Sequence, residues 1–191
     1  MHGKPIATNR GVTGIPTGKL AVWWLLASEI VIFGGILASY LMHRLGHVEF
    51  GEYASHTNTL AGAINTFVLL TSSLSAVLAH QAAEKGDGKK AAKLLLYTII
   101  GGGIFLMIKT VEWSYEISMG YTIQSNAFWH FYYTAAGVHA LHVIAGMIAM
   151  GIVAVRAHKG QELQRVELVG IYWHFVDIVW VFLFPLLYIA K

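Results

Sequence analysis

Five long apolar stretches, separated by short polar segments, set the pattern of hydrophobic and polar residues along the 191-residue chain. Each stretch has the roughly 20 residues that an α-helix needs to cross the hydrocarbon core of a bilayer. No polar segment is long enough to separate two domains, and there is no internal repeat. The pattern therefore predicts one domain over residues 1–191, an all-α membrane protein folded as a bundle of five transmembrane helices. The helices are expected at about 20–42, 60–80, 92–113, 128–155 and 166–189.

The composition supports a membrane protein and excludes several kinds of chemistry. Hydrophobic residues make up 56% of the chain and charged residues 12%, about half the charged fraction of a soluble domain. The absence of cysteine excludes disulfides, thiolate catalysis and Cys-ligated metal sites. The net charge of +3 does not indicate nucleic-acid binding, because the basic residues lie in the loops and form no single basic face.

The basic residues also predict how the bundle is oriented, because Lys and Arg are enriched in cytoplasmic loops. Of the 13 Lys and Arg residues, Arg44, Lys109 and Lys191 fall on one side of the predicted bundle. The others fall on the opposite side: Lys4, Arg10, Lys19, Lys85, Lys89, Lys90, Lys93, Arg156, Lys159 and Arg165. We therefore expect the N-terminus inside and the C-terminus outside, with residues 1–19 as a cytoplasmic tail. The tail is polar and lacks the features of a cleaved signal peptide.

Five ionisable side chains lie deep within the predicted spans: Glu29, His139, His142, His174 and Asp177. A carboxylate near the centre of a bilayer costs a few kcal/mol on insertion scales, so such groups face protein, water or a partner. The two histidines of the fourth span are three residues apart, as are the histidine and aspartate of the fifth. Each pair is therefore expected on one face of its helix.

These groups allow more than one interpretation. Two histidines on one helical turn with neighbouring carboxylates could bind zinc or iron, but the Glu-x-x-His pairs of di-metal bundles are absent. We therefore predict no metal, and interhelical hydrogen bonds that fix the packing are the simplest interpretation. A proton-linked or lipid-linked role is the alternative. Glu29 is expected to carry a proton, to bond a partner such as His139, or to lie near water.

Milder polar residues accompany this core. Asn65 and Thr66 in the second span can form hydrogen bonds within or between helices. Glu112 and Glu116 fall near the end of the third span, where we expect them to form a solvated rim. Lys109 is expected to extend its ammonium outward to the headgroups, as long basic side chains do near helix ends.

The buried polar positions also carry a resemblance to a known family. Span one reads SEIVIFGGILASY, span two INTFVLLTSSLSAVLAH, span four FWHFYYTAAGVHALHVIAGMI and span five YWHFVDIVW. In this order, these segments resemble subunit III of the haem-copper respiratory oxidases, the cytochrome c oxidase subunit III family. Span three ends in KTVEWSYE, where the family usually has Gln-x-x-Glu-Tyr. Glu112 matches that glutamate, while Lys109 and Trp113 depart from the usual residues. The chain is similar to the short bacterial form with five helices, which lacks the first two of the seven mitochondrial helices.

The resemblance implies a subunit without a catalytic residue, metal or redox cofactor of its own. Haem and copper are expected in subunits I and II, which reduce oxygen and pump protons. This chain would pack against them, with or without a small subunit IV, in the inner membrane of a bacterium. It would stabilise subunit I, support proton uptake and bind phospholipid. The implied polar core is Glu29, His139, His142, His174 and Asp177, with Asn65, Thr66 and Glu112 as secondary positions.

Three alternatives stay open at this stage. The donor to the complex is cytochrome c or a quinol, and the sequence does not decide because the donor binds other subunits. A homologue associated with nitric oxide reductase would share the same pattern. A small proton-linked transporter could use the same midplane groups, although the chain lacks the inverted repeats and broken helices typical of transporters.

Overall fold

The computed structural model describes residues 16–47 and 49–190, and no strand is found within these ranges. Within these ranges the chain forms six α-helices and a closing π-helical turn. The elements are α1 (Thr17–Gly46), α2 (Glu49–Ser55), α3 (Thr59–Glu84), α4 (Gly88–Ser118), α5 (Ala127–His158), α6 (Gln164–Phe184) and η2 (Pro185–Ile189).

The all-α fold and the five predicted spans are confirmed. In the described part of the chain, five helices are long and apolar enough to cross a membrane, the last of them running from Gln164 through η2 to Ile189. Most of them extend a few residues beyond the predicted bounds at both ends, because a helix continues past the hydrocarbon core into the headgroup region. The short helix α2 was not predicted. It lies in the polar segment between α1 and α3 and is only 7 residues long.

Three helices begin at side chains that cap their first turn. The side-chain oxygens of Asn58, Asp87 and Asn126 accept hydrogen bonds from the backbone N–H groups three residues later, at 3.1, 2.9 and 3.1 Å. Asn and Asp favour such positions because the first N–H groups of a helix have no partner within it. These caps fix where α3, α4 and α5 begin.

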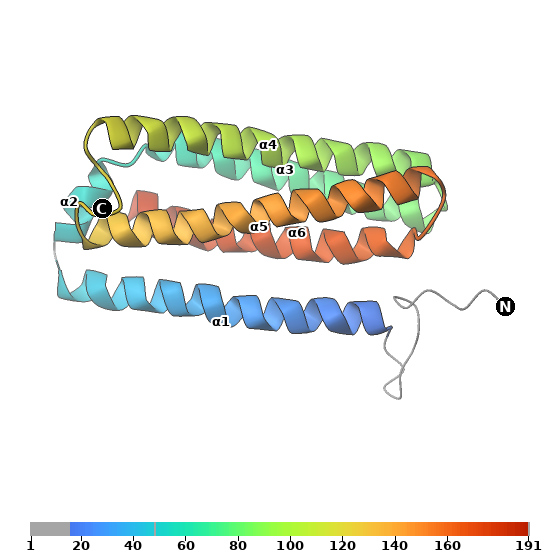
Figure 1. The fold of residues 1–191 in the computed structure, drawn as a ribbon, viewed down its shortest axis with the longest axis horizontal. Coiled ribbons are helices and arrows are strands. Elements are labelled where there is room, and N and C mark those ends of the chain that lie inside the picture. The colour runs from blue at the N-terminus through green and yellow to red at the C-terminus, as the bar shows by residue number, and fades with distance from the viewer. Residues whose placement is uncertain (1–15, 48, 191) are drawn as a thin grey trace.

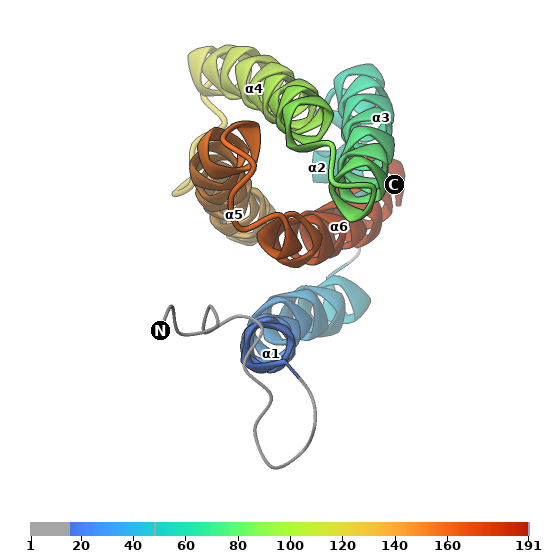
Figure 2. The same ribbon diagram turned by 90° about the vertical axis from the view of Figure 1, so that its right-hand side faces the viewer.

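Helices α3 to α6 form a four-helix ring, and α1 lies outside it against α5 and α6 (Figures 1 and 2). The start of α1 and the end of η2 lie at opposite ends of the bundle, as an odd number of crossings requires (Figure 1). We call the end that carries the α3–α4 and α5–α6 loops the basic end. It is rich in Lys and Arg, with Lys85, Lys89, Lys90, Lys93, Arg156, Lys159 and Arg165.

The interior of the ring combines large aromatic side chains with close helix contacts. Trp129, Trp173 and Trp180 are fully buried there. A Cβ placed on Gly101 of α4 would lie 2.6 Å from the Cβ of Ser72 on α3, so only glycine allows this approach. Because lipid removes the hydrophobic drive between helices, such close packing is a main source of their association.

Helix α1 is covered on one narrow face only. Its buried residues are Leu26, Glu29, Phe33 and Tyr40, spaced as one side of a helix, and they face α5 and α6. Large apolar side chains on its other faces are exposed, among them Trp24, Val31 and Met42. The exposed faces of α1 are therefore available to lipid or to another membrane protein.

Candidate polar sites in the bundle

Glu29 of α1 and His142 of α5 form a hydrogen-bonded pair across the contact between these helices. Glu29 Oε2 lies 2.9 Å from His142 Nε2. His142 Nδ1 lies 2.8 Å from the carbonyl oxygen of Val138, and because a carbonyl only accepts, Nδ1 carries a proton. The proton between the two side chains then resides either on Glu29, beside a neutral imidazole, or on His142, as an imidazolium beside a carboxylate. Both arrangements are neutral overall, and loss of that one proton leaves a single negative charge.

An apolar cleft of about 580 Å³ opens beside this pair, between α1, α5 and α6. Leu25, Leu141 and Ala145 contribute to its walls, and Glu29 and His142 are among its few polar groups. The ring of Phe33 packs edge-on against His142 with centroids 5.1 Å apart. The pair therefore sits in apolar surroundings but is not sealed off.

The sequence suggested His139 as a hydrogen-bond partner of Glu29, and this was wrong. The Glu29 carboxyl group forms its hydrogen bond with His142 instead. Successive side chains of an α-helix are 100° apart, so residues three positions apart differ by about 60° in direction. Because α1 lies outside the ring, only His142 faces it. His139 points into the ring, fully buried, with its imidazole stacked on Trp180 at 5.3 Å and edge-on to Phe105 at 5.5 Å.

Two of the predicted core residues are buried without a hydrogen-bond partner among the described residues. These are His139 and Asp177, and Asn65, a secondary position, behaves in the same way. Buried polar atoms without partners are rare in folded proteins, and an ordered water is the usual explanation.

The polar residues of α6 face α3. His174 Nδ1 and Ser73 Oγ share a hydrogen bond of 2.6 Å, and Asp177 follows one turn later on the same helix. Trp180 Nε1 donates to Thr66 Oγ1 at 3.0 Å, while the Thr66 hydroxyl donates to a backbone carbonyl in its own helix. These contacts join α3 to α6 along their length.

A second polar cluster lies near the opposite end from the basic end, and the expectation for its residues was wrong. Lys109, Glu112 and Glu116 were expected to reach the headgroups or to form a solvated rim, yet they are 2%, 6% and 2% exposed. Their spacing of three and four residues places them on one face of α4, and that face is turned toward α5 and η2. The spacing was the available signal, but the sequence did not show which way the face points.

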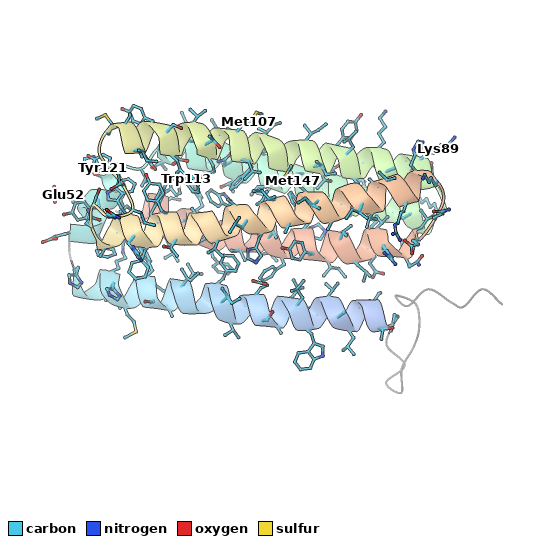
Figure 3. The ribbon with its side chains drawn as sticks, in the orientation of Figure 1. Glu52, Lys89, Met107, Trp113, Tyr121 and Met147 are labelled. Atoms are coloured by element: carbon cyan, nitrogen blue, oxygen red, sulfur yellow. The ribbon has the colours of Figure 1, made fainter. Side chains whose placement is uncertain are left out.

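Lys109 uses all three of its N–H donors within this cluster. Its Nζ lies 3.0 Å from Glu112 Oε2, 3.0 Å from Tyr132 Oη and 2.6 Å from Tyr188 Oη. The Tyr132 hydroxyl is also within 3.1 Å of Glu112 and 3.0 Å of Glu116. Four aromatic rings surround the ammonium at 4.9 to 5.8 Å, which adds cation–π stabilisation. Figure 3 shows Trp113, one of these rings, at this end of the bundle and Lys89 at the other.

The described residues contain no group of three or more His, Asp or Glu side chains that could hold a metal ion. The chain has no cysteine to add to such a group. That this subunit carries no metal of its own stays a prediction.

Known proteins match almost the whole chain. The family model for cytochrome c oxidase subunit III matches residues 8–191. Cytochrome c oxidase subunit 3 of Corynebacterium diphtheriae is 34% identical over 173 residues, 87% of this chain and 84% of the relative. The subunit 3 of Thermostichus vulcanus is 32% identical over 169 residues, with 86% and 83% covered.

A third relative combines two subunits in one chain. It is the haem-copper oxidase subunit I+III of Aeropyrum pernix, which is 32% identical over 185 residues. The match covers 90% of this chain and 22% of the fusion protein. From the family match and these relatives, the chain belongs to the cytochrome c oxidase subunit III family.

Proposed function

We propose that this chain is subunit III of a proton-pumping cytochrome c oxidase in a bacterial inner membrane, with its N-terminus inside. In this role it carries no catalytic residue or redox centre, while subunits I and II hold haem and copper. It stabilises subunit I, supports proton uptake and binds phospholipid. The family membership supports the assembly, and the buried polar pair described above supports the link to protons.

Direct packing against subunit I is supported by the Aeropyrum pernix relative, a haem-copper oxidase subunit I+III in one chain. A fusion keeps two partners at a fixed stoichiometry and within reach of one another. The exposed apolar faces of α1 supply further membrane-embedded surface for a partner or for lipid.

The Glu29–His142 pair is the observation that carries the proposal of proton handling. Glu29 lies about 18 Å along the axis from the first residue of α1, deep in a span that must cross about 30 Å of hydrocarbon. An ionisable residue at such depth is a functional candidate by default. A proton can pass between Glu29 Oε2 and His142 Nε2 without any movement of the backbone, because these two atoms are already 2.9 Å apart.

Lipid binding is supported by the clefts along α1. The cleft beside Glu29 continues toward the basic end as a second cleft of about 690 Å³, also lined by α1, α5 and α6. Val22, Ala149 and Leu168 contribute to both. Two adjoining apolar clefts beside α1, which is covered on one face only, suit an acyl chain.

The test is to purify the tagged chain in mild detergent and record the reduced-minus-oxidised spectrum of what accompanies it. Haem bands and oxygen consumption on reduced cytochrome c are expected. Consumption on quinol alone would assign the chain to a quinol oxidase. A stable preparation without haem or a large partner would overturn the assignment and favour a separate transporter.

A further inference from the structure

A groove between α4 and α5 lies at the basic end, away from the clefts that α1 forms. Its volume is about 680 Å³. Four exposed basic or titratable side chains line its mouth: Lys89, Lys93, His158 and Lys159. The two lysines of α4 come from its first turns, and the other two residues come from the end of α5. Figure 3 shows Lys89 at this end of the bundle.

The three lysines at the mouth form no ion pair within the described residues, whereas some of the other cations at the same end do. Lys19 pairs with Glu167 at 2.5 Å, and Arg156 and Arg165 both pair with Glu162. The carboxylate nearest to the start of α4 along the chain, Asp87, accepts a hydrogen bond from a backbone N–H group as the helix cap. The mouth of the groove therefore presents three lysine ammonium groups that no carboxylate pairs with, although the Lys93 ammonium also lies 5.9 Å from the ring centroid of Tyr97.

The walls of the groove are apolar below this rim. Ala92, Leu96 and Ile99 line it from α4, and Gly151, Ala154 and Val155 line it from α5. From Lys89 to Ile99 the groove descends about 15 Å along the helix axis, which is half of a hydrocarbon core of about 30 Å, or one leaflet. A Cβ added to Gly151 would have no atom within 4 Å, so the floor is open at that point.

We propose that this groove binds an anionic phospholipid, with its phosphate among Lys89, Lys93 and Lys159 and an acyl chain lying over Gly151. This lipid site rests on the proposed function in one respect, because the chain is taken to bind lipid as part of its oxidase. Clusters of basic residues next to transmembrane helices attract anionic lipids, by about 1 kcal/mol for each Lys or Arg near the surface. An acidic peptide fits less well, because extended backbone in the apolar part of the groove would leave its N–H and C=O groups without partners.

The experiment compares four forms of the tagged complex, each purified in the same mild detergent. The first is the wild type. The second removes the charge at the mouth (Lys89→Gln, Lys93→Gln and Lys159→Gln). The third fills the floor (Gly151→Phe). The fourth is a control that neutralises two exposed lysines of the same end that do not line the groove (Lys85→Gln and Lys90→Gln). Each form is washed and titrated with dioleoylphosphatidylglycerol or with dioleoylphosphatidylcholine, and bound lipid is counted by native mass spectrometry.

The wild type and the control are expected to retain one more phosphatidylglycerol per chain than the other two forms. Affinity for phosphatidylglycerol should fall roughly fivefold for each lysine neutralised, whereas phosphatidylcholine binding should change little. Gly151→Phe should lower the binding of both lipids, because the ring occupies the acyl position.

Equal phosphatidylglycerol counts in all four forms would overturn the proposal. So would loss of a protein subunit from the triple variant with its lipid count unchanged, because the groove would then bind an acidic segment of a partner. The count is made on whatever complex the chain carries. A preparation without haem bands would therefore contradict the proposed function alone, while the lipid counts would still decide about the groove.

Discussion

At the scale of single residues, the most informative side chain is Lys109, because it is a lysine buried inside a membrane-spanning helix. Its ammonium is buried with two carboxylates and is held by three hydrogen bonds. A buried charge is tolerated only where other groups replace its hydration, and here Glu112, two tyrosine hydroxyls and four rings do so. The cluster therefore depends on the cation, and the cation depends on the cluster.

Replacing Lys109 by Met should destabilise the subunit strongly. The change leaves Glu112 and Glu116 buried without a positive charge, and removing one partner of a buried ion pair costs about 3–5 kcal/mol. Lys109→Gln should cost less, because the amide still donates to Glu112 or Tyr188. The measurement is the thermal unfolding of the purified complex in detergent, with exposed Lys85→Met as the control. Equal stability of Lys109→Met and Lys85→Met would show that the cluster does not need the cation.

Two substitutions of Glu29 distinguish the effect of losing its hydrogen bond to His142 from the effect of losing its carboxyl proton. Glu29→Gln can still bond His142 but cannot release a proton, whereas Glu29→Ala removes both. Both variants should keep normal haem spectra. Glu29→Gln should assemble normally and take up protons more slowly, and Glu29→Ala should in addition assemble less completely. Proton uptake is followed with a pH-sensitive dye in reconstituted vesicles, and assembly by the ratio of subunits. Wild-type uptake, assembly and turnover lifetime in both variants would remove Glu29 from the proton route.

At the scale of helices, the sequence predicted what depends on length and composition. Five apolar stretches of bilayer length leave few alternatives, and the helix type and order follow. The spacing of His139 and His142 indicated neighbouring faces, but not that α1 would meet only one of them. Likewise the spacing of Lys109 and Glu112 marked a polar face without showing that it turns inward. Which face points where depends on the packing of all the helices together, and one helix's periodicity does not contain that information.

The contact of α3 with α4 gives a prediction at the same scale. Gly101→Ala places a methyl group 2.6 Å from the Cβ of Ser72, so the helices must separate. Overpacking of this kind costs typically about 1–3 kcal/mol. Gly34→Ala on α1 is the matched control, because its added methyl group would have no neighbour within 4 Å. Thermal unfolding should show a clear loss for Gly101→Ala and none for Gly34→Ala. A similar result for the two variants would mean that α3 and α4 do not depend on this close approach.

At the scale of the whole molecule, the two ends of the bundle differ in character. The basic end holds unpaired lysines at the surface, whereas the opposite end encloses its one lysine of α4 within the aromatic and acidic cluster. Lys109 was counted as a basic residue of its side, yet it is buried and does not meet the headgroups. Removing it from the count makes the excess of exposed positive charge at the basic end larger. The burial of Lys109 therefore strengthens the argument that the basic end faces the cytoplasm.

The orientation can be tested directly because the chain has no cysteine of its own. Lys85→Cys places a thiol in the α3–α4 loop, and Gln124→Cys places one in the α4–α5 loop, both at exposed positions. With the basic end inside, a membrane-impermeant maleimide should label Gln124→Cys in intact spheroplasts and Lys85→Cys only in inverted vesicles. The cysteine-free chain controls for background, and detergent-solubilised protein shows that both thiols react. Labelling of Lys85→Cys in intact spheroplasts would reverse the orientation, and would then place the proposed lipid groove in the outer leaflet.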